Sequence, residues 1–434
     1  MTKRLVAKLL TVAMIGSAFV GMTGTSVMAE GKPYEGVTLS VWGASTEIND
    51  TTLAIMEAAT EELGMEFEIE INPGGSDGDN ILKTKLAADE VPDLVNWNSG
   101  SKFLSVNPEK YFLDLTDEPM TEKFDDAFKS VVSVDGRVYG APQTTTQAGA
   151  VVYWKPDYEE LGLEVPKTWA DFVANCQALK DAGKTPVYLA AGGSSTWTTQ
   201  VLFLGDNYNV VSNDPEFPAQ FEAGEAKFAE NELALASWKK YEDLKDMLNA
   251  DASAATYEDG ILAMGEGEAT HWIILTQVVP EILVDYPEAA DNLGIFGIPG
   301  DDPENHGITV WEPNAWYVGQ KSENAEAAKA FLEFWVSEEN IDRYVSEYGA
   351  NGPSCIKGYT LPDTVAPAIR EDMQAYFDAG KVCPALEFQT SVKGNSCEQI
   401  TTAVATGQIT GEEAAAQYDA DCLKSAIQMG FDWK

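Results

Sequence analysis

Residues 37–72 alternate between strand and helix patterns, and this alternation constrains the fold more than any other feature of the chain. Residues 37–42 predict a strand, and residues 51–63 carry apolar side chains near helical spacing before a glycine that suits a left-handed helix end. Residues 65–72 alternate apolar side chains with Glu and Asn, which is typical of a strand with one face in water. Strand, helix and strand in direct succession predict a βαβ unit.

The same alternation continues along the chain. Residues 80–88 predict a helix that leads into a short strand at 93–97. Thr168 followed by Asp171 has the spacing of a capping box at the start of another helix, and residues 324–336 predict a further helix with an apolar stripe. We therefore expect an α/β fold with mainly parallel sheets.

The length and composition fit a large globular protein of two domains. The chain has 434 residues, of which 44% are hydrophobic and 23% are charged. Its formal net charge is -42, which repels phosphate backbones and anionic lipid headgroups and favours neutral or cationic small ligands. We therefore expect a small-molecule partner and no nucleic acid.

The N-terminus has the pattern of a secretory signal peptide. Three basic residues precede an apolar run over residues 9–20, and Val27 and Ala29 are the small or apolar residues that a signal peptidase reads. We expect removal of residues 1–29 by cleavage after Ala29, which leaves an exported protein in the periplasm or at the cell surface. No Cys precedes Cys176, so we expect no lipid-anchored N-terminal Cys.

The chain contains five cysteines, and disulfides are permitted in an exported protein. The odd number and the crowding of four of them near the C-terminus leave two interpretations open. Either one or two bridges staple the C-terminal segment, or several cysteines are reduced and act as small apolar residues. No C-x-x-C pair is present, so we expect no zinc site. The cysteines are Cys176, Cys355, Cys383, Cys397 and Cys422.

Five segments carry motifs in a definite order. They contain a Pro-Asp pair before a strand, a short hairpin, a stretch from Lys-Pro-Asp to Pro-Lys-Thr-Trp, a Gly-x-x-Ala-Met element followed by His-Trp, and a helix with the pattern Ala-Ala-x-x-Phe. The segments lie at residues 89–95, 135–142, 152–169, 260–272 and 322–335.

In this order and spacing the segments resemble the extracellular solute-binding proteins of ABC importers, family 1, which includes the maltose- and oligosaccharide-binding proteins. The chain departs from that family at Trp154, where Asn is usual. It departs again at Thr270 or His271, where the family usually has Gly.

The resemblance implies a two-lobed α/β fold of periplasmic-binding-protein type II, with the ligand cleft between the lobes. It places residues 36–145 and 297–319 in the first lobe, and residues 148–296 and 320–434 in the second. It also implies a monomeric binding protein without catalytic residues, cofactor or metal. Such a protein captures a sugar, in particular an oligosaccharide, by hinge closure and delivers it to the membrane permease of an ABC importer.

A sugar site needs aromatic rings for the C–H faces of the ligand and planar polar side chains for its hydroxyls. Trp42 and Trp97 end predicted first-lobe strands, at the edge where open α/β sheets bind ligands. Trp197 lies in a polar run, and Trp272 matches the stacking position of the family. We add to these tryptophans their polar neighbours in sequence and several residues near the lobe crossovers. The ligand-binding candidates are Trp42, Glu47, Trp97, Asn98, Gln147, Trp197, His271, Trp272, Trp311, Glu312 and Asn351.

Three further tryptophans lie on apolar stripes of predicted helices, so we expect them in the core. They are Trp169, Trp238 and Trp335.

A secreted carbohydrate hydrolase is the alternative interpretation. Residues 74–78 fit the G-x-S-x-G pattern of a hydrolase nucleophile, but the strand before them exposes a row of Glu side chains, and only His271 and His306 are available as a base. We interpret the segment as a Gly-rich loop before a helix. A glycosidase also needs two carboxylates at a fixed separation, which the 70 Asp and Glu residues leave open.

Overall fold

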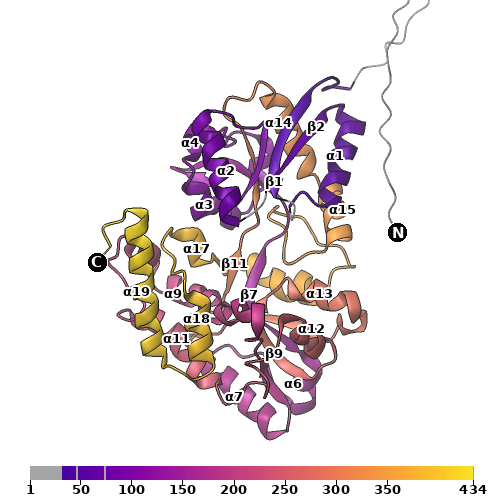
Figure 1. The fold of residues 1–434 in the computed structure, drawn as a ribbon. Helices are drawn as coiled ribbons and strands as arrows, with labels where there is room; N and C mark the ends of the chain where they lie inside the picture. Colours follow the sequence, from indigo (N-terminus) through magenta and orange to yellow (C-terminus); the bar gives the residue numbers. More distant parts are fainter. Residues whose placement is uncertain (1–31, 45–46, 73–74, 434) are drawn as a thin grey trace, which may run out of the picture.

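A computed structural model describes residues 32–44, 47–72 and 75–433, which form two lobes (Figure 1). The predicted signal peptide at 1–29 lies outside the described residues. Within the described part, no helix has the length and apolarity needed to cross a membrane.

The first lobe begins with the predicted βαβ unit. Strand β1 pairs in parallel with both β2 and β3, and Trp42 lies opposite Glu70 on one side and Val95 on the other. Helix α2 begins at Gly75, so the G-x-S-x-G segment reaches into the first turn of a helix rather than forming a longer loop. The elements are β1 (Thr38–Ala44), α1 (Asp50–Leu63), β2 (Glu66–Asn72), α2 (Gly75–Ala88) and β3 (Leu94–Trp97).

Two further strands complete this sheet, in the order β2-β1-β3-β12-β6, and β12 runs antiparallel to both of its neighbours. They are the strands by which the chain leaves the lobe and returns to it, β6 (Gly140–Pro142) and β12 (Ala315–Val318). Between β3 and β6 lie α3 (Ser101–Leu104), α4 (Pro108–Tyr111), η1 (Pro119–Lys123), α5 (Asp126–Val131) and the hairpin β4 (Ser133–Val134) and β5 (Arg137–Val138).

The second lobe is built on a six-stranded sheet in the order β13-β11-β7-β9-β8, with β10 also paired to β7. The expectation of mainly parallel sheets is wrong here, because β9, β10 and β11 all run antiparallel to the central β7. The strands are β7 (Gln147–Trp154), β8 (Thr185–Tyr188), β9 (Ala269–Leu275), β10 (Leu293–Gly297), β11 (Ile308–Trp311) and β13 (Val382–Pro384).

Helices cover both faces of this sheet, and alternate residues of β7 enter two separate cores. Val151 and Tyr153 belong to one core, and Ala150 and Val152 to the other. The first core includes residues of α7 (Trp169–Asp181), α8 (Val201–Gly205), α9 (Asn207–Val211), α10 (Phe217–Glu222), α11 (Glu232–Leu244), α18 (Cys397–Ala405) and α19 (Gly411–Met429). The second includes residues of α12 (Tyr257–Gly265), α13 (Val278–Asp285), η3 (Pro287–Ala289) and η4 (Ala368–Met373).

The remaining second-lobe helices are short. They are α6 (Lys155–Leu161), η2 (Gly193–Gln200), α16 (Gln374–Asp378) and α17 (Leu386–Gln389).

The lobe boundaries differ from the predicted ones in two segments. Residues 297–311, expected in the first lobe, extend the second-lobe sheet through β11. Helices α14 (Ala325–Trp335) and α15 (Glu338–Tyr348), expected in the second lobe, pack on β12 and α1 of the first because their apolar faces complete its core (Figure 1). The chain therefore crosses between lobes near residues 143–146, 312–314 and 349–354.

The predicted core tryptophans and the cysteines are buried. Trp169, Trp238 and Trp335 are 7%, 0% and 3% exposed, which confirms their assignment. All five cysteines are free thiols, so the disulfide alternative is wrong and the cysteines act as small apolar side chains. Thr168 caps α7 by accepting from the amide of Asp171, as its spacing predicts.

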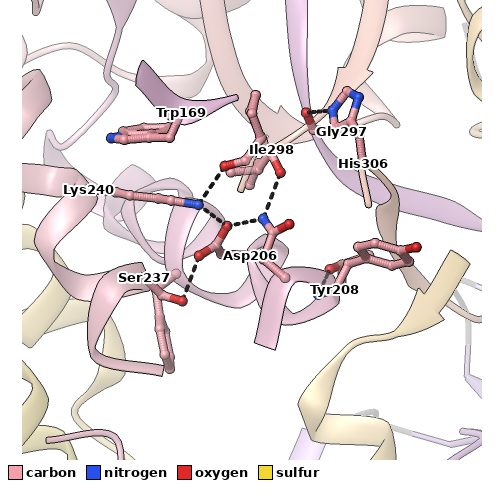
Figure 2. Close-up of polar contacts among 12 residues, drawn as sticks. Trp169, Asp206, Tyr208, Ser237, Lys240, Gly297, Ile298 and His306 are labelled. Atoms are coloured by element: carbon pink, nitrogen blue, oxygen red, sulfur yellow. Dashed lines mark hydrogen bonds and ion pairs between the residues drawn. The ribbon is translucent and has the colours of Figure 1, made fainter. Parts of the chain in front are cut away.

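A buried ion pair fixes the segment that follows β10 onto the second lobe (Figure 2). Lys240 donates to the Asp206 carboxylate and to the carbonyl oxygen of Pro299, and Ser237 donates to Asp206 at 2.7 Å. Asn209 joins Asp206 to the carbonyl oxygen of Ile298 at 2.8 Å. Both charges are almost fully buried, so removing either would leave the other without its counter-ion.

The Pro-Asp motif connects three elements of the first lobe through one carboxylate. Asp93 accepts from the backbone amide of Ser40 at 2.8 Å and from its hydroxyl at 2.7 Å, and from the hydroxyl of Ser322 at 2.5 Å. Burial alone would raise the pKa of Asp93, but the hydrogen bonds from Ser322 and Ser40 outweigh it and hold that pKa below its usual value. The ionised carboxylate thus ties β3 to β1 and to the segment before α14.

We predict that Asp93→Asn lowers the free energy of unfolding by about 1–2 kcal/mol at pH 7, a range reduced for partial solvent screening. Because the folded-state pKa is depressed, the stabilisation is present above the unfolded value of 3.8 and is lost as the pH falls through the folded value. Urea unfolding of both proteins from pH 7 to pH 3.5 should show the difference shrinking. An equal difference at every pH would contradict a role for the charge.

Candidate functional site

The two lobes meet at the crossovers, and the end of β11 has two chemically different sides. Ile308 and Val310 face one core of the second lobe, whereas Trp311 packs against the other. The next residue, Glu312, lies near Cys355, which directly follows the third crossover. We call the Trp311 side the front of the hinge and the Glu312 side the back.

Trp311 is held in a fixed orientation at the front. Its indole N–H donates to the Glu387 carboxylate of α17 at 2.5 Å. Its ring lies against Gly149 of β7, where a Cβ atom would come within 2.7 Å of the ring. A half-buried tryptophan ring with a fixed plane beside a carboxylate is suited to stacking against a flat apolar face of a ligand.

Charged side chains of the C-terminal segment surround this ring. Lys393 donates to the second oxygen of Glu387. Burial alone would lower the pKa of Lys393, but Glu387 and Glu398 outweigh it, and the pKa is raised. Glu398 accepts from the Thr196 hydroxyl at 3.0 Å. The front of the hinge therefore combines one aromatic face, two carboxylates and one cation.

The first lobe contacts this group at its edge. Asn98 follows β3 and donates to the Asn314 amide oxygen at 3.1 Å. The hydroxyl of Ser101 donates to the backbone carbonyl of Glu387 at 2.7 Å, which joins α3 to α17 across the lobes. Gln147 pairs with Trp311 in the sheet, and its buried side-chain oxygen has no hydrogen-bond partner in the described structure.

A second aromatic and acidic group lies further along the second lobe. Trp197 of η2 packs on Tyr257 with ring centroids 5.3 Å apart, and Tyr257 packs on Trp272 at 5.4 Å. Glu281 of α13 lies beside Tyr257, and burial raises its pKa. Trp197 is half-buried, so it remains available to a ligand, with Tyr257 and Trp272 behind it.

The structure brings Asn98, Gln147 and Trp311 together but places other candidates in the core. Trp42 is fully buried and Trp97 is 6% exposed, with their ring centroids 5.8 Å apart in the first-lobe core. Glu47 is half-buried, and its charge acts on Tyr348 of α15.

His271 and Trp272 are also core residues, on opposite faces of β9. His271 is fully buried, and the Tyr158 hydroxyl lies 2.7 Å from the Nε2 atom of its ring. Burial lowers the pKa of His271 to about 4. Trp272 is 1% exposed. Both rings are enclosed by side chains of the second lobe, so direct ligand contact by His271 is wrong for this arrangement.

Glu312 lies at the back of the hinge, and Asn351 lies in the third crossover. Glu312 is 5% exposed, which contradicts direct contact with a ligand in this arrangement. The backbone carbonyl of Asn351 accepts from the Thr276 hydroxyl at 2.6 Å, and its amide donates to the Thr145 hydroxyl at 3.2 Å. Asn351 therefore connects the third crossover to the first and to the end of β9.

Glu387, Lys393 and Glu398 were not among the predicted site residues. They lie more than 70 residues beyond Trp311, and no motif in the sequence connects them to it. The one usable signal is the basic charge of Lys393 in a strongly acidic chain. Their partnership with Trp311 depends on β13 pairing with β11, which brings α17 back to the hinge.

Comparison with known proteins assigns the chain to a family. The family of bacterial extracellular solute-binding proteins matches residues 54–371. The multiple sugar-binding protein of Streptococcus mutans is 24% identical over 70% of this chain and 73% of its own length. The melibiose/raffinose/stachyose-binding protein MelE of Bacillus subtilis is 22% identical over 70% of this chain and 71% of its own.

Solved structures share the two-lobed fold. The ligand-free form of RafE from Streptococcus pneumoniae matches with a TM-score of 0.74 and 20% identity over 91% of this chain and 98% of its own. RafE in complex with raffinose matches with a TM-score of 0.68 over 89% of this chain and 98% of its own, also at 20% identity. The family match covers most of the chain, and the structure has two α/β lobes around a polar, aromatic hinge. The chain therefore belongs to the bacterial extracellular solute-binding proteins and is an exported protein.

Proposed function

We propose that this protein captures an oligosaccharide at the front of the hinge and delivers it to the permease of an ABC importer. The observation that carries the proposal is the Trp311 ring, held by Glu387 where the two lobes meet. Relatives that bind multiple sugars, or melibiose, raffinose and stachyose, support a sugar as the ligand. The protein acts as a monomer after removal of residues 1–29.

The side chains around Trp311 provide the chemistry that a sugar requires. The ring offers a face for ligand C–H groups, and Glu387, Glu398 and Lys393 offer acceptors and a donor for hydroxyls. Asn98 adds a first-lobe amide. A ligand that contacts both walls binds best when the lobes close on it, so it selects the closed arrangement.

The lobe arrangement described here corresponds to the open state in this proposal. The ligand-free RafE structure matches this chain better than the raffinose-bound one, with TM-scores of 0.74 and 0.68. That difference supports an arrangement from which the lobes close.

The protein acts without chemical conversion of its ligand. His271 is enclosed in the second-lobe core, and His306 is engaged with the carbonyl oxygen of Gly297 at 2.9 Å. Both histidines belong to the second lobe, whereas α2, which contains residues 75–78 of the G-x-S-x-G segment, belongs to the first. Incubation with raffinose or stachyose should return the sugar intact, and any turnover would favour the hydrolase alternative.

We predict that an oligosaccharide raises the thermal unfolding midpoint, because a ligand that binds only the folded protein stabilises it. Raffinose, stachyose, melibiose and maltose, each at millimolar concentration, form the test panel, with sorbitol as a polyol control. A concentration-dependent rise with at least one sugar supports the proposal. No shift with any saccharide would contradict it.

We predict that Trp311→Ala weakens binding of the stabilising sugar at least tenfold, about 1.4 kcal/mol, while the protein remains folded. The matched control is Trp272→Ala, which removes a ring that is 1% exposed. That control should lower the free energy of unfolding by about 3–5 kcal/mol. Isothermal titration and urea unfolding separate the two effects, and unchanged affinity in Trp311→Ala would remove this ring from the site.

A further inference from the structure

The back of the hinge holds a buried acid that the binding site does not use. Glu312 is 5% exposed and lies on the second crossover, between β11 and β12. Its Oε1 atom has no hydrogen-bond partner, and its Oε2 atom lies 3.9 Å from the thiol of Cys355, a weak donor. No lysine or arginine of the described chain forms an ion pair with it.

The three crossovers meet around this carboxyl group. Cys355 directly follows the third crossover, and its thiol also lies 3.7 Å from the carbonyl oxygen of Thr144 on the first. The carbonyl oxygen of Cys355 accepts from the amide of Asp125 at 2.8 Å, just before α5 of the first lobe. Rotation of the lobes about the crossovers must therefore disturb the surroundings of Glu312.

The charges that face Glu312 disfavour its ionised form. Burial and the nearby acid Asp125 raise the pKa of Glu312 well above its usual value. Asp125 itself has a buried oxygen without a partner. The cation that acts on Asp125 is Lys357, which is bound to Asp126 at 2.8 Å and is itself half-exposed. An unpaired buried carboxylate is costly, so the neutral acid is the stable form here.

An open space lies beside Asp125 and the third crossover. A pocket of about 550 Å³ lies between the lobes on the same side, bounded by Asp125, Ser354 and Tyr359 and by residues of α16 and β13. Trp311 and Glu312 lie on opposite sides of one crossover, so a rotation that brings the front walls together moves the back walls apart. Closure on a ligand at the front thus opens the back to water.

We propose that Glu312 holds a proton while the lobes are open and releases it to water when they close. This inference deepens the proposed function, since it takes closure at Trp311 as the step that separates the back. Linkage between proton release and lobe closure determines how ligand affinity changes with pH. The open form, whose Glu312 carboxyl has the raised pKa, is favoured at low pH and loses that advantage as the pH rises. Ligand affinity therefore increases with pH, because binding and proton release are coupled reciprocally.

The test compares the wild type with Glu312→Gln, which keeps the side-chain shape and carries no titratable proton. Glu90→Gln, at an exposed position, removes the same charge elsewhere and serves as the matched control. Affinity for raffinose, or for whichever panel sugar stabilises the protein, is measured by isothermal titration from pH 5.5 to pH 8.5. The wild type and Glu90→Gln should tighten with pH, by at most about tenfold per pH unit for one proton. Glu312→Gln should lose this slope and bind no more tightly than the wild type at any pH of the range.

A ligand-free measurement separates failure of this inference from failure of the proposed function. Small-angle X-ray scattering over the same pH range should show the radius of gyration of the wild type and Glu90→Gln falling as the pH rises. The value for Glu312→Gln should stay constant. If no sugar binds, the proposed function fails, but the scattering comparison still tests the hinge. An identical pH response in Glu312→Gln and the wild type, by either method, would overturn the inference.

Discussion

Alternation of side chains at the end of β11 is the constraint on which the rest of this structure depends. A chain that crosses from one lobe to the other in extended form must point successive residues to opposite sides. Trp311 consequently meets Glu387 and Gly149 at the front, and Glu312 meets Cys355 at the back. One crossover thus supplies both an aromatic face for a ligand and a buried acid behind it.

The antiparallel strands follow from the need to cross between lobes. The first βαβ unit could form alone, and β6 carries the chain out of the lobe in the same direction as β3. Strand β12 brings the chain back, so it enters the first sheet between them in the opposite direction. In the second lobe β7 receives the outgoing chain, and β11 runs beside it toward the first lobe. The pairing of β13 with β11 then returns the C-terminal segment to the hinge, where Glu387 and Lys393 complete the polar group.

The sequence patterns correctly predicted those strands and helix ends that depend on residues close together in the chain. The alternation at residues 65–72 and the Thr168 cap depend on neighbours in sequence, and both appear in the structure. The position of α14 could not be predicted in this way, because its apolar face fits either lobe and only the core around β12 decides. Strand ends misled the site prediction at Trp42 and Trp97. A tryptophan at a sheet edge either faces a ligand or packs inward, and these two pack on each other.

Capture of a sugar by this protein, as proposed, requires binding against Trp311 between the lobes. A crystal structure of the protein with the sugar that stabilises it would reveal the contacts of the bound ligand. We expect a sugar ring stacked on Trp311, hydroxyl contacts to Glu387, Lys393 or Glu398, contacts from the first lobe, and a smaller angle between the lobes. A sugar bound away from Trp311, or held by one lobe with the lobe angle unchanged, would contradict the proposal.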